Sequence, residues 1–319
     1  MTLKKTEKIA VASRSFSKNP ILRSELTALY PHVSFNETGR TLMKEELIGF
    51  LQGHDKAITG LEGIDASVLK AVPSLKLISK YGVGLDMIDL KAMDHFGVQL
   101  GWMGGVNKRS VAELALAFFL LLVRGIPQSN ASLKARHWAQ APGNQLTGKT
   151  IGIIGCGNVG QDLVRLLQPF SCPILVNEIK EYPDFFQRFT LQTVSLEELL
   201  TRSDIVSLHI PLNASTNNLI SQHRIKQMKQ GAFLVNTARG NIVDEEALKE
   251  SLKSKHLAGA AFDVFGVEPP LNPELISLPG FFGTPHIGGS SVEAVLAMGR
   301  AAIENLDRGQ SPLEFLSQQ

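Results

Sequence analysis

An arginine, a glutamate and a histidine in the second half of the chain could together interconvert a 2-hydroxy acid and its 2-keto acid. Arg239 follows "LVNTA", Glu268 follows "AFDVFGV", and His286 lies within "GTPHIGG". A guanidinium holds a carboxylate through two parallel hydrogen bonds and polarises a neighbouring ketone. An imidazole exchanges a proton near neutral pH, and a carboxylate beside it favours the protonated ring. We therefore predict that Arg239 binds the substrate, His286 transfers the proton and Glu268 supports His286.

Each of these three residues, taken alone, has a simpler interpretation. A loop arginine is usually a solvated surface charge, a glutamate before a proline is commonly a turn residue, and a histidine close to two glycines can cap a turn. All three, however, stand at the ends of predicted strands or just beyond them. Ligands of open α/β sheets bind beyond the carboxyl ends of the strands, so the combination favours a catalytic site.

A glycine-rich stretch in the middle of the chain could hold the cofactor of such a reaction. "KTIGIIGCGNVGQDLVRLL" places Gly155, Gly157 and Gly160 in a G-x-G-x-x-G pattern between a predicted strand and a predicted helix. The first glycine permits a tight turn, the second lets the backbone approach a pyrophosphate, and the third lets helix and strand pack closely. The N–H groups of Asn158 and Val159 would then face the phosphate charge.

An acidic residue at the end of the next predicted strand supports a dinucleotide. Glu178 lies eighteen residues beyond Gly160, where a carboxylate would accept hydrogen bonds from the adenosine ribose. The same carboxylate would repel a ribose phosphate, so the sequence favours NAD over NADP. The simpler alternative is a glycine-rich turn in an unrelated α/β sheet, and the position of Glu178 argues against it.

Two alternations of strands and helices position these residues. Alternating strands and helices predict parallel sheets covered by helices. The first alternation has strands expected at 8–13, 56–60 and 75–82 and helices at 22–30 and 65–72. The second has strands at 150–155, 174–178, 204–211, 231–238 and 257–265 and helices at 158–170, 195–203 and 244–255.

These alternations predict an α/β protein with two interleaved, doubly wound parallel-sheet domains. We expect residues 1–100 to form a flavodoxin-like lid domain that binds substrate, and residues 101–287 to form a Rossmann domain that binds NAD. Residues 288–319 would carry a C-terminal helix back to the lid. Long helices at 110–124 and 290–309 would connect the two domains, with the substrate in the cleft between lid and cofactor.

The composition sets limits on partners and location. The 319 residues contain 32 lysines and arginines against 30 aspartates and glutamates, which gives no electrostatic reason to expect a nucleic acid or a membrane surface. The apolar run Val111–Val123 is too short to cross a bilayer. Two cysteines and no signal-peptide pattern favour a cytoplasmic location. No cluster of histidine, cysteine and carboxylate residues has metal-ligand spacing, so we expect no metal.

Six segments together resemble the D-isomer-specific 2-hydroxyacid dehydrogenases, with phosphoglycerate dehydrogenase-like members nearest. The resemblance covers roughly residues 55–310. The segments are "ISKYGVGLDMIDL", "NKRSVAELALAFFLLLVR", "GKTIGIIGCGNVG", "VNTARGNIVDEEAL", "AGAAFDVFGVEP" and "TPHIGG".

The resemblance implies roles for particular residues. It implies that Arg239, Glu268 and His286 form the catalytic set, that backbone N–H groups around Val83 and Gly84 hold the substrate carboxylate, and that the protein is a homodimer. It also implies a set of contacts to NAD beyond the glycine loop. These residues are His209, Pro211, Thr237, Ala238, Asp263, His286, Gly288 and Gly289, with Arg239 beside them.

Three positions depart from the usual pattern of this family. Asn158 stands where an arginine is often found, and Glu178 stands where aspartate is commoner. In the lid, Glu62 lies near a place where some phosphoglycerate enzymes carry a basic residue. A carboxylate there would oppose a phosphate dianion unless Lys80 or another cation offsets it.

Two other functions remain open on the sequence. An NAD-sensing binding protein or corepressor on the same scaffold keeps a similar catalytic set, so the set alone does not exclude it. A formate dehydrogenase is disfavoured, because that branch resembles this one but has glutamine where Glu268 stands.

Overall fold

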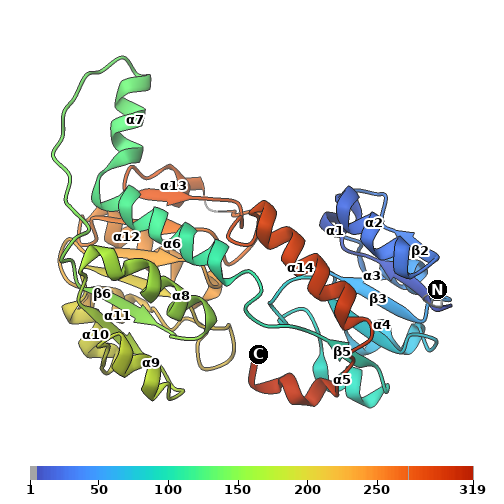
Figure 1. Cartoon of the computed structure of the whole chain (residues 1–319). Helices are drawn as coiled ribbons and strands as arrows, with labels where there is room; N and C mark the ends of the chain where they lie inside the picture. The colour runs from blue at the N-terminus through green and yellow to red at the C-terminus, as the bar shows by residue number, and fades with distance from the viewer. Residues whose placement is uncertain (1–5, 272, 319) are drawn as a thin grey trace. The chain divides into compact units, whose positions relative to one another are not determined.

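The computed structural model describes residues 6–271 and 273–318 and divides into two compact units (Figure 1). One unit holds the residues up to Asn107 together with those from Ser290 onward, and the other runs from Lys108 to Gly289. The expected boundaries are at residues 100 and 287. The first boundary lies later because Trp102 stays with the N-terminal unit, where its ring packs 5.4 Å from that of Phe315.

The first unit is built on a sheet of five parallel strands in the order β2-β1-β3-β4-β5. This is the flavodoxin-like order, as expected from the sequence. The strands are β1 (Lys8–Val11), β2 (His32–Phe35), β3 (Lys56–Thr59), β4 (Leu77–Lys80) and β5 (Gln99–Gly101). The helices are α1 (Arg14–Lys18), α2 (Pro20–Leu29), α3 (Lys44–Leu51), α4 (Ala66–Ala71), α5 (Leu90–His95), α14 (Val292–Asn305) and the 3₁₀ segment η3 (Pro312–Gln318).

Both faces of this sheet are covered, which explains why its central strands are largely apolar without alternation. Ile9 and Val11 of β1 pack in one cluster with residues of α2 and α14, whereas Ala10 packs in another with residues of α3, α4 and α5. The C-terminal helix α14 therefore packs on this sheet. Figure 1 shows it in red beside α2, and Ser79 of β4 donates a hydrogen bond to the carbonyl of Ala302 at 2.7 Å.

The second unit is built on a sheet of seven parallel strands in the order β12-β11-β10-β9-β6-β7-β8. The strands are β6 (Ile151–Ile154), β7 (Ile174–Asn177), β8 (Gln192–Thr193), β9 (Ile205–Leu208), β10 (Phe233–Asn236), β11 (Gly259–Phe262) and β12 (Phe281–Gly283). The helices are α6 (Lys108–Val123), α7 (Ile126–Lys134), α8 (Asn158–Leu167), α9 (Pro183–Arg188), α10 (Leu196–Arg202), α11 (Gln222–Gln227), α12 (Glu245–Lys253) and α13 (Pro273–Ser277), with 3₁₀ turns η1 (Gln168–Phe170) and η2 (Gly240–Ile242).

Successive side chains along these strands are buried on opposite faces of the sheet. Ile151 and Ile153 pack with residues of α6 and α8, whereas Ile154 packs with residues of α10, α11 and α12. Period-two alternation with both faces apolar is the pattern of a doubly wound sheet. The expected Rossmann architecture is confirmed.

Four strands are not predicted from the sequence, and all four are edge strands of their sheets. β2 and β5 border the first sheet, and β8 and β12 border the second. They have two to four residues and are partly exposed, so they lack the continuous apolar run of a central strand. The helix expected over 158–170 ends at Leu167 and continues as η1, since Pro169 has no N–H to donate.

The apolar run predicted as a buried helix is α6, which packs along α8 and against β10 and β11. Within the described part of the chain, no single helix has the length and apolarity of a bilayer span. In the described residues, only the pair α6 and α7, bent by 64° at their junction, is long and apolar enough when the two helices are taken together.

Candidate active site and cofactor loop

The chain changes direction across the second sheet between β6 and β9. From β6 it runs outward through β7 to β8, then returns to β9 and continues outward the other way to β12. The connections that follow β6 and β9 therefore lead to helices on opposite faces of the sheet, α8 and α11. Ligands of such sheets bind in a crevice at this point. The glycine loop follows β6, and His209 follows β9.

The three glycines of the fingerprint have different surroundings. Gly155 has φ +89°, and a Cβ built on it would lie 2.5 Å from the carbonyl oxygen of His209. A Cβ on Gly160 would lie 2.3 Å from the carbonyl oxygen of Gly155. A Cβ on Gly157 would meet no atom within 4 Å, and Gly157 is the N-cap of α8. Gly155 and Gly160 thus permit close packing, and Gly157 leaves open space at a helix N-terminus, which fits a pyrophosphate.

The first-turn residues of α8 are Asn158 and Val159, whose N–H groups have no carbonyl partner inside the helix. α8 is tied to α6 by a buried carboxylate. Asp162 lies 2.9 Å from Nε of Arg109 and 3.6 Å from Nη1 of Arg165. This tie fixes the helix whose N-terminus faces the open space at Gly157.

Cys156, inside the fingerprint, is a structural residue. Its side chain is fully buried, and burial raises the pKa of the thiol to about 12, with the charge of Glu178 adding to the shift. The thiolate is therefore scarce at neutral pH, and the cysteine is a small residue of a tight loop and no nucleophile.

Glu178 lies directly after β7 and organises two loops. One of its oxygens accepts the N–H of Cys156 at 2.6 Å. The other accepts the N–H groups of Ile179 at 2.8 Å and Lys180 at 2.9 Å. The carboxylate is thus fixed beside the glycine loop, which is where the sequence places the partner of the adenosine ribose.

His209 and Pro211 begin the loop after β9. The Nε2 of His209 lies 2.9 Å from the hydroxyl of Ser207, and burial lowers the pKa of the imidazole to about 4. His209 is therefore neutral at physiological pH. Its backbone carbonyl is the atom that Gly155 approaches, so this loop packs directly on the fingerprint.

Arg239 is held by a turn that follows β10. The buried amide of Asn236 donates to the carbonyl of Arg239 at 2.8 Å and accepts the N–H of Ala238 at 3.0 Å. The Nη1 of Arg239 donates to the carbonyl of Ala238 at 2.7 Å. Thr237 is nearly buried, and its hydroxyl has no hydrogen-bond partner within the described residues.

The Arg239 turn packs on the loop that carries Glu268. A Cβ built on Gly240 would lie 1.8 Å from the carbonyl carbon of Phe265, so only glycine permits this approach. The N–H of Gly266 donates to Glu245 at 2.7 Å, and the N–H of Phe265 donates to Glu268 at 3.2 Å. The loops after β10 and β11 are thereby joined.

Asp263 anchors the loop that carries His286. This carboxylate is 1% exposed. It accepts the hydroxyl of Thr284 at 2.6 Å and the N–H groups of Ile287 and Gly288, each at 2.7 Å. The N–H of His286 donates to the carbonyl of Asp263 at 2.9 Å. His286 has φ +55°, a left-handed conformation that few residues other than glycine adopt, and these bonds on both sides of it hold it there.

Glu268 and His286 are in contact. The Oε2 of Glu268 lies 2.8 Å from the Nδ1 of His286, and both side chains are partly exposed. Nδ1 is thus occupied by the carboxylate, and Nε2 is the nitrogen left for a ligand. Gly289, the last residue of this unit, follows Gly288 at the end of the same loop.

Val83 and Gly84 belong to the first unit and follow β4. The N–H groups of Gly82, Val83 and Gly84 have no hydrogen-bond partner among the residues that the structure describes, and Gly82 has φ +114°. Successive unpaired N–H groups in a turn suit an anion. They lie at the carboxyl edge of the first sheet, where a ligand is expected.

Glu62, which follows β3 in the first unit, is not a surface charge. Its side chain is 1% exposed and accepts the N–H of Gly60 at 2.6 Å, and Nζ of Lys80 donates to the carbonyl of the same glycine. Glu62 and Lys80 therefore hold one peptide segment from both sides. The sequence identified Glu62 as a carboxylate that would oppose a phosphate, but it did not indicate that this side chain is buried.

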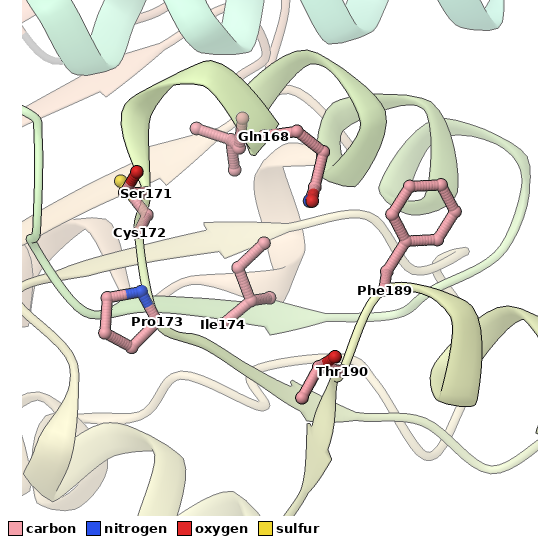
Figure 2. A pocket seen from close by; sticks show the side chains of 8 residues that line it. Gln168, Ser171, Cys172, Pro173, Ile174, Phe189 and Thr190 are labelled. Atoms are coloured by element: carbon pink, nitrogen blue, oxygen red, sulfur yellow. The ribbon is translucent and has the colours of Figure 1, made fainter.

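The second unit also contains a small cavity that lies away from the carboxyl edge of its sheet. It has a volume of about 170 Å³, and Figure 2 shows it between η1, the start of β7 and the end of α9. Ile174 is the first residue of β7, so the cavity lies at the amino ends of the strands, away from the glycine loop. It is lined by Leu167, Gln168, Ser171, Cys172, Pro173, Ile174, Phe189 and Thr190.

Three residues that shape the site are not singled out for these roles by the sequence. Asn236 forms the turn before Arg239, Asp263 anchors the His286 loop, and Trp102 contacts Val83. Asp263 is expected to contact nicotinamide, and its anchoring role depends on N–H groups over twenty residues away in the chain. No local pattern signals such a bond.

Comparisons with known proteins agree with this architecture. Residues 116–288 match the family model of the D-isomer specific 2-hydroxyacid dehydrogenase NAD binding domain. A hydroxypyruvate reductase of Thermotoga maritima is 36% identical over 276 residues, which covers 84% of this chain and 89% of the relative. A D-3-phosphoglycerate dehydrogenase of Methanocaldococcus jannaschii is 34% identical over 297 residues, 90% of this chain but only 56% of that longer protein.

Solved structures resemble the whole chain as well. The crystal structure of a glyoxylate reductase from Paecilomyes thermophila superposes with a TM-score of 0.85 at 25% identity and covers 95% of this chain and 94% of that one. The glycine loop with open space for a pyrophosphate, the acid–imidazole pair and these similarities have one common explanation. The chain belongs to the D-isomer specific 2-hydroxyacid dehydrogenases, the NAD-dependent oxidoreductases that interconvert D-2-hydroxy acids and 2-keto acids.

Proposed function

We propose that this protein reduces a short, unphosphorylated 2-keto acid of the glyoxylate or hydroxypyruvate type to the D-2-hydroxy acid. The observation that carries the proposal is the contact of Glu268 with Nδ1 of His286 at 2.8 Å, on loops joined to the Arg239 turn. The relatives named hydroxypyruvate reductase and glyoxylate reductase support this substrate size.

The cofactor would be held at the crevice beside β6. Gly155, Gly157 and Gly160 with the N–H groups of Asn158 and Val159 would bind the pyrophosphate, and Glu178 would bind the ribose. Contacts nearer the reacting carbon would come from the loops that follow β9, β10, β11 and β12. NADH, when bound, supplies the hydride. The remaining proposed contacts are His209, Pro211, Thr237, Ala238, Arg239, Asp263, His286, Gly288 and Gly289.

The substrate would be bound by Arg239 and by the N–H groups of Val83 and Gly84. A carboxylate accepts several N–H groups at once, and the guanidinium carries five donors in a fixed plane. Arg239 would also stabilise the negative charge that develops on the ketone oxygen as the carbon is reduced.

His286 would supply the proton that completes the reduction. Its Nδ1 faces Glu268, so its Nε2 would donate a proton to the oxygen that becomes the hydroxyl. Glu268 stabilises the imidazolium before this transfer. In the oxidative direction, neutral His286 takes the hydroxyl proton as the hydride leaves the carbon, which keeps atoms and charge in balance.

The preference for an unphosphorylated substrate rests on the charges of the first unit. The buried carboxylate of Glu62 opposes a phosphate dianion near the carboxyl edge of this sheet. Nζ of Lys80, a buried cation of the same region, is directed at the carbonyl of Gly60. A short keto acid has one negative charge, which the unpaired N–H groups can satisfy.

A substrate survey tests the proposal. The oxidation of NADH is followed by absorbance with glyoxylate, hydroxypyruvate, pyruvate, 2-ketoglutarate and 3-phosphohydroxypyruvate. We expect the highest kcat/KM with glyoxylate or hydroxypyruvate, at least about tenfold above the phosphorylated compound, which corresponds to about 1.4 kcal/mol. Higher activity with 3-phosphohydroxypyruvate would overturn the substrate assignment. Tight NADH binding without turnover of any keto acid would favour an NAD-sensing binding protein.

We further propose that the protein is a homodimer. The helix α7 buries none of its residues, and it projects from the second unit in Figure 1. Apolar side chains lie exposed on it and just after it, with Leu133 57% and Trp138 78% exposed. A second copy of the chain could cover them. Light scattering should give twice the chain mass of 34.7 kDa, and Leu133→Lys should shift the mass toward one chain.

We also propose that the protein is cytoplasmic, because both cysteines are unpaired and a thiol such as Cys172 persists in a reducing compartment. Cell fractionation with detection of the native protein tests this. Recovery in a secreted or membrane fraction would contradict it.

A further inference from the structure

The peptide between Val83 and Gly84 is held from its carbonyl side. Nε1 of Trp102 donates a hydrogen bond to the carbonyl of Val83 at 3.1 Å. Trp102 directly follows β5, which pairs with β4 in the first sheet, so the two segments leave neighbouring strand ends. The indole therefore reaches the segment after β4 from the adjacent strand.

This hydrogen bond also sets the direction of the Gly84 N–H. The Val83–Gly84 peptide is trans, and in a planar trans peptide the carbonyl and the N–H point in opposite directions. With the carbonyl directed at Trp102, the N–H of Gly84 points away from the indole. That N–H has no hydrogen-bond partner in the described part of the chain.

The indole itself is fixed by the C-terminal segment. The ring of Phe315 in η3 packs edge-on against Trp102, with centroids 5.4 Å apart and planes at 68°. Leu100 of β5 and Gln310 exchange two backbone hydrogen bonds of 3.0 Å, which join β5 to the start of this segment. Trp102 thus lies between the strand edge and the C-terminal segment, both in the first unit.

We propose that Trp102 is a positioning residue for the carboxylate of the substrate. It orients the Val83–Gly84 peptide so that the Gly84 N–H is presented to the anion before binding. The hydrogen bond to the carbonyl also polarises the peptide and makes its N–H a stronger donor. This inference rests on the proposed function, in which Val83 and Gly84 bind the substrate carboxylate.

The test is Trp102→Phe, which removes the indole N–H and keeps an aromatic ring against Phe315. We expect the KM of the best keto acid to rise roughly 3- to 10-fold, the effect of one hydrogen bond, while kcat changes less and the Kd of NADH is unchanged. Phe315→Leu is the matched control, because it loosens the packing and leaves the N–H in place. Its KM should change by less than that of Trp102→Phe.

A direct binding measurement separates the possible failures. Titration of oxamate, a non-reacting keto-acid analogue, into the NADH complex should show a Kd that is roughly 3- to 10-fold weaker in Trp102→Phe. An unchanged KM and an unchanged oxamate Kd in an active protein would overturn the role of Trp102 and leave the proposed function intact. A wild-type protein that neither turns over keto acids nor binds oxamate would overturn the proposed function, and this inference with it.

If Trp102→Phe does not fold, benzothienylalanine at position 102 replaces it. That residue keeps the shape of the two fused rings and lacks only the N–H donor. The same increase in KM is expected, and an unchanged KM would again overturn the role.

Discussion

The carboxylate of Glu268 lies 2.8 Å from Nδ1 of His286, although the two residues are carried by loops that leave different strands, β11 and β12. The His286 loop is fixed independently by Asp263, which accepts the N–H groups of Ile287 and Gly288. The imidazole is thus held at its ring by one acid and through its backbone neighbours by another, which leaves Nε2 as the nitrogen available to a ligand.

His286→Gln should lower kcat/KM by roughly 100-fold or more, because it removes the proposed proton donor of the reduction. Glu268→Gln should cost less, since the amide still accepts a hydrogen bond from Nδ1 and only the charge is lost. The double variant should resemble His286→Gln alone, because the two residues act as a unit. Steady-state kinetics with the best keto acid measures all three, and additive losses would contradict a paired role.

Arg239→Ala should abolish measurable reduction while NADH still binds, because in the proposed function the guanidinium binds the substrate and the glycine loop binds the cofactor. NADH fluorescence measures binding, and absorbance measures turnover. Arg239→Lys is the matched control. It keeps the charge but loses the planar pair of donors, so it should recover only part of the activity. Full activity in Arg239→Ala would remove this residue from the chemistry.

Asp263→Asn should destabilise the second unit by about 1–3 kcal/mol, because the new NH₂ group faces N–H donors that then lack a buried acceptor. Its kcat should fall as well, since the His286 loop loses its anchor. Urea unfolding and kinetics measure the two effects. Thr284→Val removes one hydrogen bond to the same carboxylate and should have a smaller effect on both. Equal stability of Asp263→Asn and the wild type would refute the anchoring role.

Glu178→Gln should raise the kcat/KM ratio of NADPH to NADH, because the negative charge that would repel a ribose phosphate is removed. Glu178→Asp keeps the charge and should keep the discrimination, with weaker bonds to Cys156 and Lys180. An unchanged ratio in Glu178→Gln would show that the cofactor preference is set by other residues.

His209 should make the protein less stable in acid. Burial lowers the pKa of its imidazole from 6.5 to about 4, so between these values the unfolded chain binds a proton that the folded chain does not. The free energy of unfolding should therefore fall as the pH falls from about 6.5 to about 4 and be fully recovered above that range. His209→Asn should flatten this part of the curve from urea unfolding at several pH values. An equally steep curve would assign the acid sensitivity to other groups.

The central strands, the glycine loop and the three catalytic candidates could be identified from the sequence, because their signals are local. A strand buried on both faces is a run of apolar residues, and a tight turn before a helix needs glycine at fixed spacing. The edge strands β2, β5, β8 and β12 carry no such run. They form because a neighbouring strand offers hydrogen bonds, which a local pattern does not record.

The sequence by itself determined which reactive groups this protein carries, since the guanidinium, imidazole and carboxylate of Arg239, His286 and Glu268 are groups that suit the reduction of a keto acid. Only the tertiary structure decided that Glu268 faces Nδ1, that Glu62 is buried against Gly60, and that Trp102 holds the carbonyl of Val83. Residue types fix which protons and charges exist. Distances between residues far apart in the chain depend on how the sheets pair and how the loops pack, so they exist only in the folded protein.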